Sequence, residues 1–61
     1  MLLSETGKDL LFTPEEVALA LKIAEQTLAR WRFEGTGPNY IRMGGKVRYF
    51  GRDVQRFVTN A

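Results

Sequence analysis

The sequence contains no cysteine and no histidine. Without cysteine there can be no disulfide and no thiolate ligand for a metal. Without histidine the commonest metal ligand and the commonest general base are both missing. Zinc or iron catalysis and histidine-activated nucleophiles are therefore disfavoured. We expect a protein that is not an enzyme, with no metal site and no cofactor.

Long apolar runs are also missing. No stretch approaches the ~18–20 apolar residues that a membrane span requires, and Leu10–Phe12 is too short for the core of a signal peptide. We therefore expect no membrane segment and a cytoplasmic location. The 61 residues are enough for one small domain, near the lower limit for folding without a disulfide or a metal.

Positive charge is concentrated in the second half of the chain. Residues 30–56 carry seven basic and two acidic side chains, a net charge of +5, whereas residues 1–29 carry −3. The basic residues of this segment are Arg30, Arg32, Arg42, Lys46, Arg48, Arg52 and Arg56. Such a segment suits a polyanion, and nucleic acid is the first candidate.

A strong helix start follows a segment without sustained periodicity. Residues 1–10 predict a flexible N-terminal arm or a loosely docked strand, and residues 11–61 a single domain. Thr13 is the expected N-cap, with Pro14 in the first helical position and Glu16 completing a capping box. Because such signals are local, we expect the first helix to begin here.

A second helix is predicted from about Glu25 to Phe33, after a break near Lys22-Ile23. Gly35 is the expected C-cap glycine, and Gly37-Pro38 prevents the helix from continuing. Two short helices joined by a turn indicate a helix-turn-helix.

Residues 40–50 predict a β-hairpin, and residues 52–58 predict a last helix. The order of helix, helix, two-stranded wing and helix is that of a mainly α winged helix-turn-helix. The expected core residues are Val17, Ala20, Leu21, Ile23, Leu28, Trp31, Ile41, Met43, Val47, Val54, Phe57 and Val58.

Two registers of the hairpin are conceivable. A two-residue Gly-Gly loop would pair Met43 with Lys46 and mix apolar and charged side chains on each face. A three-residue loop that includes Lys46 would pair Met43 with Val47 and place Arg42 and Arg48 together on the opposite face. We predict the second register, because it alone gives one apolar face.

The outer face of the second helix carries side chains that suit a major groove. Gln26 and Arg30 lie four residues apart, and glutamine and arginine pair with adenine and guanine, respectively. Thr27 could bond a phosphate or touch a thymine methyl group, and Glu25 could contact cytosine or simply favour the helix start. Ala29 is small enough for close approach. The alternative is an ordinary solvated helix face.

The hairpin and the start of the last helix supply a second candidate surface. Lys46 lies at the tip of the wing between Arg42 and Arg48, where the three could reach phosphates or the minor groove. Arg52 could bind a phosphate from the last helix. The alternative is a charged, exposed hairpin that resists edge pairing.

Several motifs within residues 11–58 occur together in this order. They are T-P-E-E-V-A, T-L-x-R-W, G-x-G-P, and G-G-K-V-R-Y leading into R-D-V. In these motifs the chain resembles the small MerR-like winged-helix domains of phage excisionases and AlpA-type regulators. It departs from them at Lys22, where glycine is common, and at Ala24, where a serine or threonine cap is common.

The resemblance implies a recognition helix in the major groove and a wing over the adjacent minor groove or backbone. Positions matching the groove-facing residues are Gln26, Thr27 and Arg30, and those matching the wing are Arg42, Lys46 and Arg48. The resemblance assigns no role to Arg32 or Arg56.

The leading hypothesis is a sequence-specific double-stranded DNA-binding protein, an excisionase that bends DNA and assists a phage-type integrase. Excisionases assemble head to tail on adjacent sites. We therefore expect a monomer in solution that assembles cooperatively on DNA, in the bacterial cytoplasm or nucleoid. The first alternative is a small AlpA-like transcriptional regulator. The second is a protein-interaction module for an acidic partner.

Overall fold

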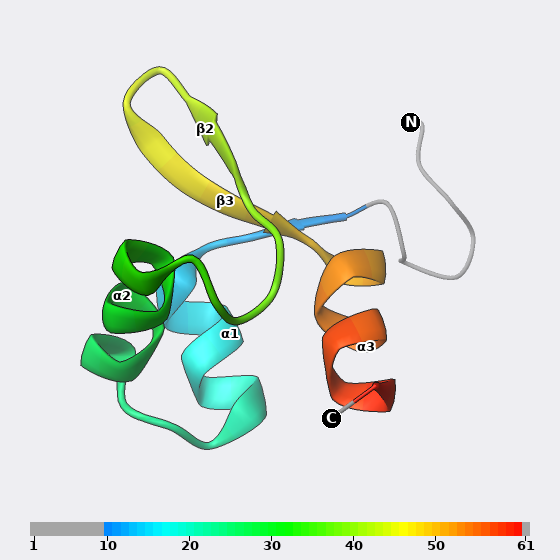
Figure 1. The fold of residues 1–61 in the computed structure, drawn as a ribbon. Helices are drawn as coiled ribbons and strands as arrows, with labels where there is room; N and C mark the ends of the chain where they lie inside the picture. Colours follow the sequence, from blue (N-terminus) through cyan, green and yellow to red (C-terminus); the bar gives the residue numbers. More distant parts are fainter. Residues whose placement is uncertain (1–9, 61) are drawn as a thin grey trace.

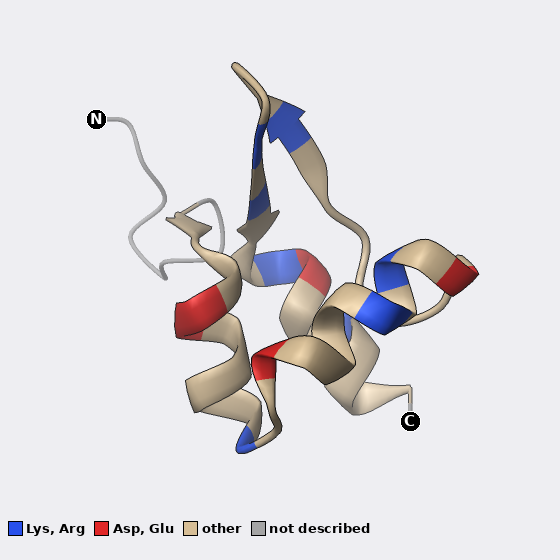
Figure 2. Ribbon diagram, turned by 90° about the vertical axis from the view of Figure 1, so that its left-hand side faces the viewer, with Lys and Arg blue, Asp and Glu red and all other residues tan. Residues whose placement is uncertain are grey.

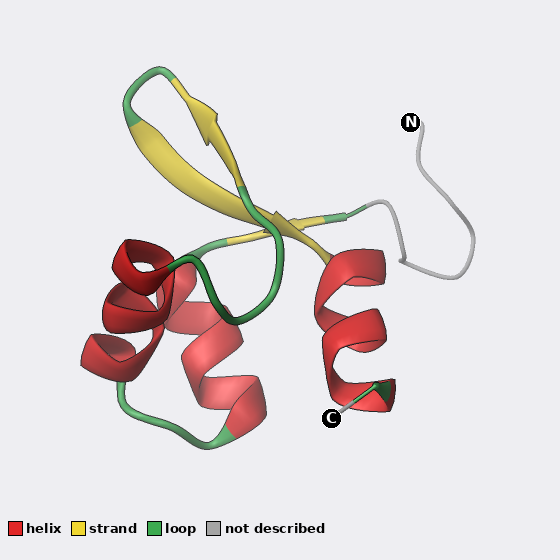
Figure 3. Cartoon of the chain, in the orientation of Figure 1, coloured by secondary structure: helices red, strands yellow, loops and turns green. Residues whose placement is uncertain are grey.

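Three helices and a three-stranded antiparallel sheet make up the part of the chain that the computed structural model describes, residues 10–60 (Figures 1 and 3). In chain order the elements are β1 (Leu11–Phe12), α1 (Pro14–Leu21), α2 (Glu25–Glu34), β2 (Ile41–Met43), β3 (Lys46–Phe50) and α3 (Gly51–Thr59). The predicted winged helix-turn-helix is confirmed. The predicted arm lies outside the described residues except for Leu10.

The first helix begins at the predicted capping box. Thr13 Oγ1 accepts a hydrogen bond from the Glu16 amide at 3.1 Å, and Glu16 Oε1 accepts one from the Thr13 amide at 2.9 Å. Pro14 occupies the first turn, and Phe12 packs against the core cluster that contains Val17. Such a cap contributes about 1 kcal/mol, a large share of the stability of so small a domain.

The turn between α1 and α2 depends on a left-handed residue. Lys22 has φ 60°, which for a residue other than glycine costs about 1–2 kcal/mol. The Ile23 amide then donates to the Ala18 carbonyl at 3.0 Å and closes the turn. No side chain among residues 10–60 caps α2 at Ala24, yet the helix begins at Glu25 as predicted.

The end of α2 is held by glycine and by Trp31. Gly35 is left-handed with φ 80°, and the Thr36 amide donates to the Trp31 carbonyl at 2.8 Å. The loop then passes directly over Trp31, because a Cβ at Gly37 would lie 2.9 Å from that side chain. The Trp31 ring also packs against Phe57, with centroids 5.4 Å apart, so it joins α2, the loop and α3.

The sheet contains a strand that the sequence did not predict. The strand order is β1-β3-β2, and β1 pairs antiparallel with β3 through Leu11↔Phe50 and Phe12↔Tyr49. Two residues are too few to show a period, so only the distant partner strand identifies β1. This pairing ties the start of the domain to the base of the wing.

The predicted hairpin register is wrong. The observed pairs are Arg42↔Val47 and Met43↔Lys46, joined by a two-residue loop. Gly44 and Gly45 have φ 56° and 83°, and two residues with positive φ form the type I′ turn whose twist matches the flanking strands. The register of the hairpin is therefore set by the type I′ turn at Gly44-Gly45 and not by the pairing that would give one apolar face.

This register changes which side chains project from each face of the wing. Arg42 lies opposite Val47, whereas Arg48 lies opposite Ile41, so the two arginines project from opposite faces rather than together. Met43, predicted in the core, is 48% exposed beyond the end of the packed sheet.

The core is centred where α1, α2 and β3 meet. Its buried residues are Val17, Ala18, Leu28 and Tyr49, and the partly buried residues around them are Phe12, Leu21, Ile23, Trp31, Tyr40, Val47 and Val54. Two further core predictions fail. Ala20 is exposed, because Val17 and Ala18 fill the inner face of α1, and Val58 is 51% exposed beside the inward-facing Val54.

Candidate nucleic-acid interface

Two basic elements project on the same side of the molecule. The views agree that α2 and the β2–β3 hairpin share one side, with α3 on the other (Figures 1 and 2). Basic segments lie along the hairpin and the later part of α2, while acidic segments mark the beginnings of α1 and α2, the end of α2 and the first turn of α3 (Figure 2). The charge asymmetry of the sequence is therefore clearest on the hairpin, where residues 40–50 carry basic and no acidic side chains.

Most of the predicted groove-facing side chains lie on the exposed face of α2. Glu25, Gln26 and Arg30 are exposed, and Thr27 is half-buried at the edge of this face. Leu28 is fully buried and fixes the rotation of the helix. The helix therefore presents Gln26 and Arg30 to the exterior.

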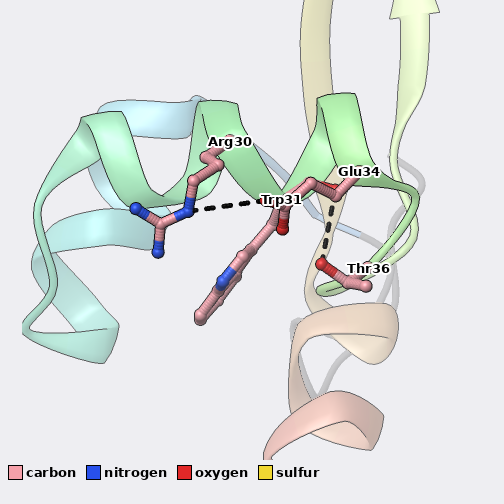
Figure 4. A network of polar contacts seen from close by, with 4 residues as sticks. All are labelled: Arg30, Trp31, Glu34 and Thr36. Atoms are coloured by element: carbon pink, nitrogen blue, oxygen red, sulfur yellow. Dashed lines mark hydrogen bonds and ion pairs between the residues drawn. The ribbon is translucent and has the colours of Figure 1, made fainter.

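Arg30 has a partner on its own helix. Its Nε lies 3.9 Å from Glu34 Oε2, and the two side chains are 62% and 51% exposed (Figure 4). An exposed i,i+4 pair stabilises a helix by only about 0.3–0.5 kcal/mol. The pair therefore holds Arg30 weakly, and a stronger ligand can displace Glu34.

The wing carries its positive charge on two faces. Arg42 and Lys46 are exposed, and Arg48 is half-buried. Arg48 Nη1 donates to the Val47 carbonyl at 2.7 Å, which holds this side chain along its own strand.

Arg32 links the two basic elements, a role that the sequence did not reveal. Its Nη1 donates to the Tyr49 hydroxyl at 2.8 Å, and Tyr49 is fully buried. The guanidinium carbon of Arg32 also lies 6.0 Å from the centre of the Tyr40 ring, and that of Arg42 lies 5.9 Å from it. Arg32 follows Leu28 by four residues, and this spacing places a basic residue on the inner face of the helix. That placement is the feature of the sequence that could have indicated its role.

The described elements match a known family. The profile of a helix-turn-helix domain matches residues 11–61. The chain belongs to this helix-turn-helix family. No curated protein matches it.

Membership supports sequence-specific DNA binding, since the helix-turn-helix family includes small DNA-binding proteins of the excisionase and AlpA types. Its members are typically not enzymes. Within residues 10–60 of this helix-turn-helix domain, no group of three or more acidic, histidine or cysteine side chains could hold a metal ion. In the same range no helix is long and apolar enough to cross a membrane.

Two further basic residues of the helix-turn-helix domain, Arg52 and Arg56, lie on α3. The Arg52 guanidinium carbon is 4.6 Å from the centre of the Phe50 ring, which keeps this exposed side chain near the base of the wing. Arg56 lines an open cavity between the α2–β2 loop and α3, together with Asp53 and Asn60. Arg52 is thus close to the hairpin, whereas Arg56 lies beside the loop.

Proposed function

We propose that this helix-turn-helix domain is a double-stranded DNA-binding protein that acts as an excisionase of a phage or integrated element. One observation carries the proposal: Gln26 and Arg30 are exposed on α2, and this helix lies on the same side of the molecule as the basic hairpin (Figures 1 and 2). A helix and a wing on one side suit a groove and the backbone next to it.

In this proposal α2 enters the major groove. Gln26 pairs with adenine, and Arg30 pairs with guanine after its weak contact with Glu34 opens. Thr27, half-buried at the edge of the helix, bonds a phosphate, while Glu25 lies near a cytosine amino group.

The wing and the start of α3 hold the backbone or the minor groove. Arg42 and Arg48 project from opposite faces of the hairpin, which suits contact with two different phosphates. Lys46 is exposed next to the tip and contacts a phosphate there, and Arg52 contributes a phosphate contact at the base. Several such contacts give binding that is strong at low salt and independent of sequence.

One small domain makes a small interface, so several copies on adjacent sites would compensate for it. We therefore propose a monomer in solution that assembles head to tail on DNA, bends it, and assists an integrase in the bacterial cytoplasm or nucleoid. A small AlpA-like regulator would use the same surface. The rival from another class is a module that binds an acidic protein.

The first test is titration of duplex DNA at varied salt. If about five phosphates are neutralised, binding should weaken by about 500-fold between 50 and 200 mM salt. Affinity that hardly changes with salt would contradict the DNA interface.

The second test separates the two DNA-binding roles. Excision of an element should depend on the chain when the integrase encoded next to its gene is supplied in purified form. Integrase that excises equally well without it would favour the regulator.

A further inference from the structure

Phe33 is the most exposed of the large apolar side chains in the described part of the chain, at 92%. Single exposed apolar side chains are common on protein surfaces, so exposure alone assigns no role. The position of Phe33 on α2 is what distinguishes it from the others.

Phe33 lies at the centre of the outer face of α2. It follows Gln26 by seven residues and Arg30 by three, which places it within about 20° of Gln26 around the helix axis. Ala29, four residues before Phe33, is also exposed on this face. The methyl group and the phenyl ring therefore form an apolar strip beside Gln26 and Arg30.

The outer face of α2 from Gln26 to Phe33 has the length of a groove contact. These two residues are separated by about 10.5 Å along the helix axis, roughly three base-pair steps of about 3.4 Å each. One helix face can thus contact several neighbouring base pairs, with Phe33 at its C-terminal end.

The chemistry of a phenyl ring selects one partner in that groove. Glutamine and arginine recognise hydrogen-bond donors and acceptors, whereas a phenyl ring offers neither to a base edge or a phosphate. The apolar group that a major groove presents is the 5-methyl group of thymine, which phenylalanine contacts well.

We propose that Phe33 is a specificity residue that packs against the methyl group of a thymine beside the base pair contacted by Arg30. The inference rests on the proposed DNA-binding function and adds an apolar contact to it. It predicts a target site with a thymine at a fixed position.

The test uses the full chain and a duplex that it selects from a random-sequence library. Each thymine of the selected duplex is replaced in turn by deoxyuridine, which removes only the methyl group. At one position the unaltered chain should bind about fourfold more weakly, the effect of exposing one methyl group. Phe33→Ala should bind the original duplex about tenfold more weakly and show no further loss at that position.

Leu19→Ala is the matched control, because Leu19 is 80% exposed but lies on α1. It should bind both duplexes as the unaltered chain does. Circular dichroism should show Phe33→Ala folded, since the side chain makes little contact with the domain.

The possible results separate this inference from the proposed function. Salt-dependent binding in which no thymine methyl group is coupled to Phe33 would overturn the inference and leave the DNA-binding function standing. Equal losses by Phe33→Ala on the thymine and deoxyuridine duplexes would also overturn it, and would assign the ring to a second copy or another protein. Selection of no duplex at all would overturn both.

Discussion

In the proposed complex, Arg30 has two competing partners, Glu34 and a guanine. Its contact with Glu34 is 3.9 Å long and exposed, so it stabilises the helix only slightly. A guanine offers two acceptors in a fixed geometry, which a bidentate guanidinium matches better than a single carboxylate oxygen at this distance. The weak ion pair with Glu34 is therefore easily replaced by the proposed guanine contact.

Replacing Arg30 should change specificity as well as affinity. Arg30→Ala should weaken binding to the selected duplex by about 1–3 kcal/mol and relax the preference at one base pair. Lys46→Ala is the comparison, because Lys46 lies next to the tip of the wing. It should weaken binding to all sequences alike and flatten the salt dependence by about one unit of slope.

Fluorescence anisotropy with specific and random duplexes at several salt concentrations measures both effects. If Arg30→Ala leaves the ratio of the affinities for specific and random duplexes unchanged, Arg30 does not take part in base recognition.

The angle between α2 and the wing depends on a contact between elements. The hydrogen bond from Arg32 to the Tyr49 hydroxyl joins them directly, and the Tyr40 ring packs 6.1 Å from the Tyr49 ring. In the proposed complex, α2 contacts the groove while the wing contacts the backbone, so the hydrogen bond between Arg32 and Tyr49 would set the position of one contact relative to the other.

Removing the hydroxyl group tests this coupling. Tyr49→Phe should lower the free energy of unfolding by about 1–2 kcal/mol, because the Arg32 guanidinium loses a hydrogen bond in a partly buried site. Binding should become less salt-dependent at 25 °C, since fewer wing residues reach phosphates at once.

Tyr40→Phe is the control, because it keeps the ring near which Arg32 and Arg42 lie. It should bind with the original salt slope. If Tyr49→Phe also keeps the original salt dependence of DNA binding, the hydrogen bond from Arg32 contributes to stability but not to the position of the wing on DNA.

Which elements could be predicted depends on how local their signals are. The cap at Thr13 and the left-handed Gly35 lie within a few residues of the helix ends that they fix, and both predictions are confirmed. The two-residue strand β1 and the partly buried contact of Arg32 depend on β3, which lies far away in the sequence. The predicted hairpin register was wrong for a related reason. Met43 lies beyond the core and is exposed, so the expectation of one apolar face on the hairpin did not apply there.

The exposed face of α2 was predictable from the sequence, but the arrangement of the basic residues on the hairpin was not. Helical periodicity sufficed to place Gln26 and Arg30 on the exterior. It did not show that Arg42 and Arg48 would lie on opposite faces, because that depends on the turn. Helical spacing also places Phe33 on this face, seven residues after Gln26, but the sequence does not give the 92% exposure that distinguishes its side chain.

The whole domain is held together by few contacts, and Trp31 is the side chain on which three parts of it converge. It packs against Phe57 of α3 and against the loop at Gly37. A domain of this size has about 3–5 kcal/mol of stability in total. A disturbance at Trp31 should therefore affect folding of the entire chain and not one element.

Two glycines allow this to be tested with matched substitutions. Gly35 and Gly37 have φ 80° and 82°, so alanine is strained similarly at both. A Cβ at Gly35 meets nothing within 4 Å, whereas one at Gly37 lies 2.9 Å from Trp31. Gly35→Ala should cost about 1–2 kcal/mol, and Gly37→Ala should cost roughly 1–3 kcal/mol more because it overpacks the tryptophan.

Urea denaturation followed by Trp31 fluorescence measures both variants, since Trp31 is the single tryptophan of the chain. Gly37→Ala should be partly unfolded without denaturant, and a saturating concentration of duplex DNA should restore its folded signal, because a ligand that binds only the folded state stabilises it. Equal midpoints for the two variants would mean that the loop adjusts freely over Trp31. The domain would then be stabilised mainly by the cluster around Leu28 and Tyr49.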